Sequence, residues 1–183
     1  MGWTETVNGY SGDVKSFLIG EMEGDTGINH FKVLGYRRVG NEVYIAMERI
    51  SNETGEQIVF AIVCLIRFKD GNIAYKDMDE TVEPSYYNCP ESILKLLTEP
   101  INEHAETWRK KCRVGREKRK ELNNDLKIGN RLLLETDIKF ADGNQTGVLE
   151  VTSEKPLIFN GRYRVSKKYI TDLGYEVEVK QNY

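Results

Sequence analysis

The stretch QIVFAIVCLIRF, residues 57–68, decides the fold of the N-terminal part of the chain. It is nearly continuously apolar and rich in Val, Ile and Phe, a composition that favours a β-strand at the centre of a sheet. Two similar runs precede it, at residues 31–37 and 42–50, and short polar turns separate the three. This spacing predicts an antiparallel meander in which helices cover one face of the long third strand. A further short strand is expected at residues 73–75, after a turn at residues 70–72.

Apolar residues at helical spacing predict the helices that pack on this sheet. A first helix is expected between residue 12 and about residue 24, with an apolar face made of Val14, Phe17, Leu18 and Met22. Pro90 is suited to the first position of a second helix, because its missing N–H would have no partner there anyway. The buried side of that helix is predicted to consist of Ile93, Leu94, Leu96 and Leu97.

A third helix is predicted after Pro100, and it carries both an apolar and a basic face. Its inward stripe is predicted to hold Ile101, Ala105, Trp108 and Cys112. Its outward side is predicted to hold Arg109, Lys110, Arg113 and Arg116. The helix is expected to fray near Gly115, because residues 116–125 have almost no apolar side chains and end in Asn-Asn-Asp, a composition typical of a linker.

The residues after this linker form a second pattern of short apolar runs. The runs lie at residues 131–134, 138–140, 147–151, 157–159, 162–165 and 176–180, with Asp-Gly and Asn-Gly turns between them. They predict a small five-stranded β-barrel, and the polar turn at residues 166–170 resembles the helical turn that closes Src-homology-3 barrels. The predicted fold class is α+β, with an antiparallel sheet and helices at residues 1–115, a linker at 116–125 and a barrel at 126–183.

Composition limits the class of protein. The chain has 183 residues, of which 39% are hydrophobic and 30% charged, so it can form a buried core. No apolar run approaches the roughly 20 residues of a membrane-spanning helix, and the first residues lack the features of a signal peptide. Of the three cysteines, Cys64 lies in the apolar run described above. Free thiols and these absences predict a cytoplasmic protein that does not bind membranes.

Residues 108–120, WRKKCRVGREKRK, contain eight Lys and Arg against one Glu in a chain of net charge −3. Such a block is either a solvated helix face or a nucleic-acid-binding surface. Four further basic residues in the predicted barrel could extend it into a strip along a phosphate backbone. The candidate nucleic-acid-binding residues are Arg109, Lys110, Lys111, Arg113, Arg116, Lys118, Arg119, Lys120, Arg162, Arg164, Lys167 and Lys168.

Residues 75–90 form an acidic segment rich in Tyr. Its carboxylates either interact with the positive end of the helix that follows or form a surface that binds Arg and Lys of a partner protein. The candidate partner-binding residues are Asp77, Asp79, Glu80, Glu83, Tyr86 and Tyr87.

Catalytic and metal-binding patterns are weak. The chain has no Gly-rich phosphate loop and no Cys-x-x-Cys or His-x-x-x-His spacing. A thiol site built from Cys89, Cys112 and His104 is conceivable, but buried or merely neighbouring roles are favoured because no base, orienting group and oxyanion site can be named together. The Asp-x-Asp-Glu run beginning at Asp77 lacks the glycine and distal Glu of a calcium loop. We therefore predict a protein without enzymatic activity, cofactor or metal.

Four segments carry a resemblance to a known family. MGWTE at residues 1–5, YKDMDET at 75–81, YYNCPESILKLL at 86–97 and WRKKC at 108–112 resemble a family of small proteins carried by phages and mobile elements of gut Firmicutes. Within it, the chain is similar to type II-A anti-CRISPR proteins. The resemblance implies a stoichiometric inhibitor of DNA cleavage in the bacterial cytoplasm. Its implied partner is a type II CRISPR RNA-guided endonuclease, with DNA or guide RNA as further contacts.

The alternative is a nucleic-acid-binding accessory protein of a phage or mobile element. The net charge of −3 is too small for a full mimic of DNA, whose phosphates carry a much higher charge density. Binding of the nuclease followed by a block of cleavage is therefore the expected mode of inhibition.

Overall fold

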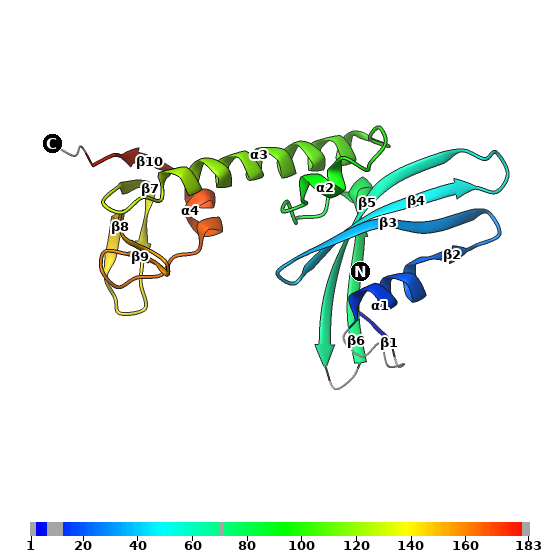
Figure 1. Cartoon of the computed structure of the whole chain (residues 1–183), viewed down its shortest axis with the longest axis horizontal. Coiled ribbons are helices and arrows are strands. Elements are labelled where there is room, and N and C mark those ends of the chain that lie inside the picture. Colours follow the sequence, from blue (N-terminus) through cyan, green and yellow to red (C-terminus); the bar gives the residue numbers. More distant parts are fainter. Residues whose placement is uncertain (1–2, 7–12, 70–71, 181–183) are drawn as a thin grey trace. The chain divides into compact units, whose positions relative to one another are not determined.

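A computed structural model of the chain describes residues 3–6, 13–69 and 72–180. It divides the chain into two compact units, Met1–Val114 and Gly115–Tyr183 (Figure 1). The elements of the first unit are β1 (Thr4–Thr6), α1 (Val14–Met22), β2 (Gly24–Asp25), β3 (Asn29–Val39), β4 (Glu42–Ser51), β5 (Gln57–Lys69), β6 (Asn72–Asp79), the 3-10 helix η1 (Glu80–Val82), α2 (Glu91–Leu94) and the start of α3 (Glu103–Asp125). The second unit contains the end of α3, β7 (Arg131–Lys139), β8 (Gln145–Glu154), β9 (Leu157–Phe159), α4 (Lys167–Leu173) and β10 (Tyr175–Glu178). The fold class is α+β.

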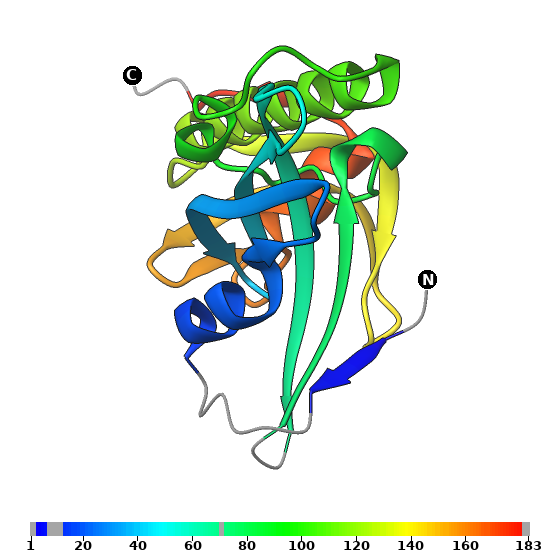
Figure 2. The same cartoon turned by 90° about the vertical axis from the view of Figure 1, so that its right-hand side faces the viewer.

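The first unit is built on a six-stranded antiparallel sheet of order β1-β6-β5-β4-β3-β2. The predicted meander is confirmed, since β3 pairs with β4, β4 with β5, and β5 with β6. The apolar stretch is the central strand β5, which Figure 2 shows beside β6. The turn expected at residues 70–72 falls mainly on residues 70–71, which lie outside the described residues. β6 runs further than predicted, to Asp79, and the short strands β1 and β2 were not predicted because they are only three and two residues long.

Helices cover both faces of this sheet, whereas the sequence predicted helices on only one face. α1 packs Phe17 and Leu18 against one face, together with Ile45 and Met47 of β4 and Cys64 of β5. The predicted apolar face of α1 is confirmed, and the Asp13 side chain caps the helix by accepting hydrogen bonds from the N–H groups of residues 15 and 16. A strand that is apolar at successive positions presents apolar side chains to both faces, which explains the second layer.

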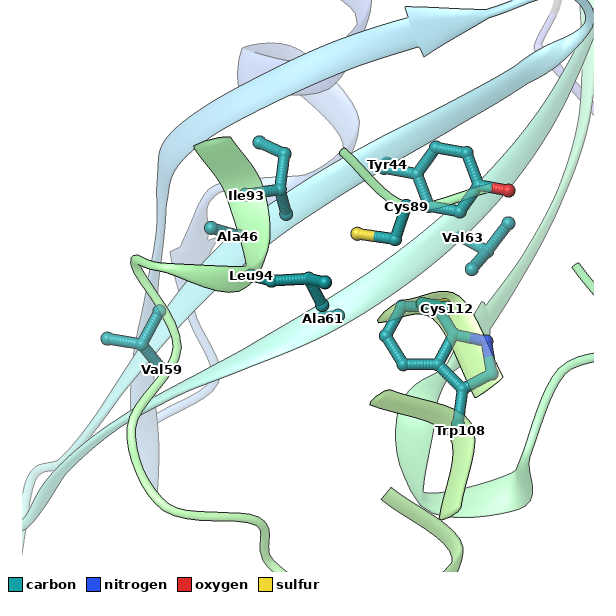
Figure 3. Close-up of a cluster of buried hydrophobic side chains, with 10 residues drawn as sticks. All are labelled: Tyr44, Ala46, Val59, Ala61, Val63, Cys89, Ile93, Leu94, Trp108 and Cys112. Atoms are coloured by element: carbon teal, nitrogen blue, oxygen red, sulfur yellow. The ribbon is translucent and has the colours of Figure 1, made fainter. Parts of the chain in front are cut away.

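The opposite face is covered by α2 and the first half of α3 (Figure 3). Trp108 and Cys112 of α3 pack with Tyr44 and Val63 of the sheet, and all four side chains are fully buried. α2 is shorter than predicted. It ends at Leu94, so Ile93 and Leu94 are buried while Leu96 is 42% exposed.

The predicted linker at residues 116–125 is helical, since α3 continues without a break to Asp125. Lys, Arg and Glu are good helix formers, so this segment needs no apolar face of its own to stay helical. The side chain of Leu122 is fully buried in the core of the second unit and anchors the segment there. Ile101 lies before the helix and is 45% exposed, so it does not belong to the buried stripe.

The second unit contains a four-stranded antiparallel sheet of order β10-β7-β8-β9. The runs at residues 131–134 and 138–140 form one strand, β7, whose pairing with β8 is irregular between Leu133 and Ile138. Residues 162–165 are not a strand. After the turn at Asn160, whose φ is +49°, only Tyr163 forms a bridge back to Phe159. The expected helical turn is the seven-residue helix α4, capped by the Ser166 side chain. In the described part of the chain, no helix is long and apolar enough to cross a membrane.

Candidate functional site

The acidic segment and the first half of α3 meet inside the first unit. Asn102 connects them at the start of the helix: its side-chain oxygen accepts from the Ala105 N–H at 2.9 Å, and its nitrogen donates to the Thr81 carbonyl at 3.2 Å. Farther along, the Trp108 indole N–H donates to the Tyr86 carbonyl at 3.0 Å. These contacts hold η1 and the residues after it against α3.

Glu80 and Arg109 form a buried, bidentate ion pair at this contact. Nε of Arg109 lies 2.7 Å from Oε2 of Glu80, and Nη2 lies 2.5 Å from Oε1. The side chains are 6% exposed for Arg109 and 0% for Glu80. Nη1 of Arg109 donates to the Thr98 carbonyl at 2.5 Å, and Thr98 in turn bonds the backbone of Val59 in β5. The pair therefore connects η1, α3 and the loop before α3.

This pair corrects two predictions. Glu80 was expected to bind a partner protein and Arg109 to bind nucleic acid, but each is the other's partner. Arg109 follows Trp108 directly and precedes Cys112 by three positions, so it borders the buried stripe of α3. That spacing could have indicated its burial from the sequence. Its partner, 29 residues earlier, could not have been found in this way.

Glu83 and Lys111 form a second, exposed ion pair between the same two segments. Nζ of Lys111 lies 2.5 Å from Oε1 of Glu83, and Nδ1 of His104 lies 3.7 Å from Oε2. The Lys111 side chain is 50% exposed, and its Nζ lies 5.3 Å from the centre of the Tyr87 ring. The hydrogen bond from Lys111 lowers the pKa of Glu83, and the same bond raises the pKa of Lys111. These two candidates also bind each other.

The remaining acidic candidates do not share one surface with Glu83. Asp77 pairs with Cys64 and Asp79 with Ile62 in the register of β6 and β5, so both side chains lie on the sheet face that α1 covers. Asp79 also caps η1 by accepting from the Thr81 N–H at 2.8 Å. Of the two aspartates, Asp77 is the exposed one.

Tyr86 and Tyr87 are partly buried against the core on the opposite face of the sheet from Asp77. The six predicted partner-binding residues are therefore distributed over two faces of the sheet. A single acidic binding surface does not form from them.

A hydrogen-bond network that the sequence did not indicate holds the end of the acidic segment to the sheet. The Tyr44 hydroxyl donates to the Glu42 carboxylate and accepts from the Asn88 N–H at 3.0 Å. The Asn88 side chain also donates to Glu42 at 3.3 Å. Burial, then the bond to Glu42, raises the pKa of Tyr44. The only local signal was the alternation of Glu42 and Tyr44 on one strand face.

The predicted nucleic-acid-binding residues differ in whether their charge is free to contact a partner. Arg109 and Lys111 are paired internally. Lys110 and Arg113 are exposed in the first unit, and within the described ranges they form no ion pair. In the second unit, Arg116 and Arg119 are half-buried, whereas Lys118 and Lys120 are exposed.

The basic residues beyond α3 lie in the second unit. Arg162 lies 3.5 Å from Asp142 and over the Tyr163 ring, so it is engaged inside the unit. Lys167 donates to the Asn123 side chain at the end of α3 at 2.5 Å. Arg164 and Lys168 are exposed and form no ion pair in the described part of the chain.

Lys118 lies at a pocket of about 470 Å³ in the second unit. Lys118 lines it together with three carboxylates, those of Glu121, Asp125 and Glu135. The Tyr175 hydroxyl donates to Asp125 at 3.0 Å, and burial together with this bond raises the pKa of Tyr175. Lys118 thus has three carboxylates among its neighbours.

The residues considered for catalysis and metal binding differ in their exposure to solvent. Cys89 and Cys112 are buried in the core, as is Cys64, and all three thiols are free. Burial raises the pKa of Cys64 to about 12 and also raises that of Cys89. The His104 side chain is 66% exposed beside Glu83. Among the residues that the structure describes, no group of three His, Cys, Asp or Glu side chains is arranged to hold a metal ion.

Comparison with known proteins gives one match. Residues 99–168 match the model of a family described as a domain of unknown function, DUF6927. The match includes the basic segment, α3 and most of the second unit, and excludes the acidic segment. No curated protein and no solved structure matches the chain.

Proposed function

We propose that the protein acts by binding, as a stoichiometric inhibitor of DNA cleavage by a type II RNA-guided nuclease. The observation that carries the binding part concerns the predicted nucleic-acid-binding residues. Five of them stay exposed and without an ion pair in the described ranges: Lys110 and Arg113 in the first unit, and Lys120, Arg164 and Lys168 in the second. Because these charges have no internal partner in the described ranges, an anionic macromolecule is their best complement. The choice of the nuclease as target rests on the family resemblance.

The internal pairing changes which contacts the inhibitor is proposed to make. Glu80 and Glu83 are engaged by α3, so the acidic segment contributes little beyond Asp77 to a partner surface. A nuclease loaded with guide and target displays RNA and displaced DNA, and it must move its nuclease domain before it cuts. We propose that the leftover cations contact this nucleic acid on the assembled complex and that the bound protein prevents that movement.

A purified cleavage assay with nuclease, guide and target tests this function. We expect cleavage to stop at near-equimolar protein, without turnover. Unchanged cleavage at large molar excess, across several type II-A nucleases, would contradict the inhibitor function.

Two variants then assign the cations to a unit. K110Q/R113Q alters the first unit and K120Q/R164Q/K168Q the second. Each should lower the affinity for nucleic acid. Each should also make the plot of log binding constant against log salt concentration less steep, by up to about 0.9 for every phosphate contact removed. The matched control is K127Q/K139Q/K155Q, which neutralises three exposed lysines of the second unit outside the candidate set. If this control weakens binding equally, the effect is one of net charge and the assignment is wrong.

The alternative function is a nucleic-acid-binding accessory protein of a phage or mobile element. The same exposed cations favour it, and it does not require the resemblance. Its signature is salt-dependent binding of free DNA in a gel-shift assay with no effect on nuclease cleavage. An inhibitor of the assembled complex should instead stop cleavage, and neutralising the cations should weaken that inhibition.

For the second unit, we further propose the architecture of a small Src-homology-3-like barrel. The support is the antiparallel order β10-β7-β8-β9 with α4 placed directly before the last strand. An experimental structure in which the sheet closes on itself would establish this architecture. A sheet that stays open and flat would contradict it.

A further inference from the structure

The outer edge of β3 is largely uncovered. β2 pairs with only two residues of β3, His30 and Phe31, whereas β4 pairs with β3 from Asn29 to Val39, with a shift of register between Val33 and Gly35. Within residues 3–6, 13–69 and 72–180, no strand pairs with the outer edge of residues 32–39. Such an edge presents backbone N–H and C=O groups that can form a ladder with an added strand.

One backbone group shows what this edge can bind. The Val33 N–H donates to Oε1 of Glu23, the residue that ends α1, at 2.9 Å. This N–H is therefore directed away from β4, toward the position that a neighbouring strand would occupy. The Glu23 oxygen stands in for the carbonyl oxygen of such a strand.

A groove of about 190 Å³ lies beside the edge, between α1 and β3. Figure 2 shows α1 next to this part of the sheet. Leu18 and Ile19 line the groove from α1, and Val33, Leu34 and Tyr36 line it from β3. Ile19 is 45% and Leu34 39% exposed, so apolar surface is open to solvent at the uncovered edge. An apolar side chain from an added strand would cover it.

The charges around the edge indicate the chemistry of that strand. Lys32 and Arg37 are exposed and β3 contains no acidic residue; the carboxylates nearby are Glu48, opposite Lys32 in the register of β4, and Glu23, which lines the groove. The Arg37 guanidinium donates to the Tyr36 carbonyl at 3.0 Å, which holds its charge beside the backbone. Lys15 adds a cation from α1 at the groove. These charges complement an acidic segment and would repel a second copy of β3.

We propose that residues 32–39 of β3 form a docking site for an acidic, extended segment of a partner protein. The segment adds to the outer edge as a strand, replaces Glu23 at the Val33 N–H, and places one apolar side chain in the groove against α1. Backbone hydrogen bonds supply affinity, while the groove and the cations supply specificity. This site is separate from the cations of α3 and does not depend on the nuclease as target.

A selection of short random peptides on the purified full chain, followed by calorimetric titration of the enriched peptides, tests this docking site. We expect the enriched peptides to be acidic and to alternate apolar with polar residues. K32E/R37E should reduce their affinity about tenfold or more, because like charges then face the peptide. I19W should weaken binding by filling the groove. E23A should strengthen binding, because it removes the internal competitor for the Val33 N–H.

Matched controls separate docking from net charge and from misfolding. K139E/K155E makes the same change of charge at two exposed lysines of the second unit and should leave peptide affinity unchanged. Thermal unfolding of K32E/R37E and I19W should match the wild type, since Lys32, Arg37 and Ile19 are exposed. The proposal is overturned if no peptide is enriched, if the enriched peptides are basic, if K32E/R37E and I19W both leave affinity unchanged, or if E23A weakens binding.

Discussion

The buried pair Glu80–Arg109 and the exposed pair Glu83–Lys111 join the same two segments of the first unit, but they differ in environment and therefore in consequence. The first pair is removed from water and satisfied by bidentate hydrogen bonds and the Thr98 carbonyl. The second is open to solvent, where water competes with the pair. Ion pairs of similar length thus have different roles: the inner pair fixes the position of α3, and the outer pair can exchange its partners.

The largest expected effect comes from breaking the inner pair. Arg109→Leu leaves the Glu80 carboxylate buried without a partner, and we expect the free energy of unfolding to fall by about 3–5 kcal/mol in urea denaturation. The double variant E80L/R109L should recover part of this loss, because no buried charge remains. Lys111→Leu is the matched control at the outer pair. Equal losses for Arg109→Leu and Lys111→Leu would mean that burial does not distinguish the pairs.

A smaller loss of stability is expected from a substitution of Trp108, the residue before Arg109. Trp108→Phe keeps an aromatic ring in the core but leaves the Tyr86 carbonyl without its donor. We expect a loss of about 1–3 kcal/mol in the free energy of unfolding, because a partly buried acceptor loses its hydrogen bond and a small void forms. Denaturation followed by circular dichroism measures it. A stability equal to that of the wild type would show that water replaces the indole.

At the outer pair, Glu83→Gln should leave the urea midpoint nearly unchanged, because exposed ion pairs contribute little to stability. The matched substitution Glu80→Gln, which also preserves side-chain shape, should lower the midpoint clearly. A comparable fall for both variants would refute the difference that burial is expected to make.

The smallest effect is the pH dependence that the outer pair contributes. The pKa of Glu83 lies below its ordinary value of 4.5, so this carboxylate contributes stability above that pH and loses the contribution as pH falls through the folded-state pKa. NMR titration of the Glu83 carboxyl should give a midpoint below 4.5, and Lys111→Gln should move it back toward 4.5. A midpoint that Lys111→Gln leaves in place would assign the lowered pKa to another neighbour.

The sequence predicted most of the first unit because its signals are local. The β-branched runs marked β3, β4 and β5, and the spacing of Phe17 and Leu18 marked α1. The apolar period was a poor guide at residues 116–125. Their Lys, Arg and Glu side chains favour a helix without an apolar face, and the buried Leu122 packs this helix on the core of the second unit.

The candidate site was less predictable than the fold. The sequence identified an acidic and a basic segment, and exposed cations such as Lys110 and Arg113 lie where the helical period placed them. It did not indicate that the two segments bind each other. Glu80 and Arg109 are 29 residues apart, and no period connects a 3-10 helix with a later α-helix.

By itself, then, the sequence determined the long strands and the first helix of the first unit, their apolar faces and the separation of charge into two blocks, because these depend on residues that are neighbours along the chain. Only the tertiary structure decided which charges are neutralised inside the protein, which stay exposed, and which strand edge stays uncovered. Those outcomes depend on distances between segments far apart in sequence, and the strength of an ion pair or hydrogen bond is set by such distances and by burial.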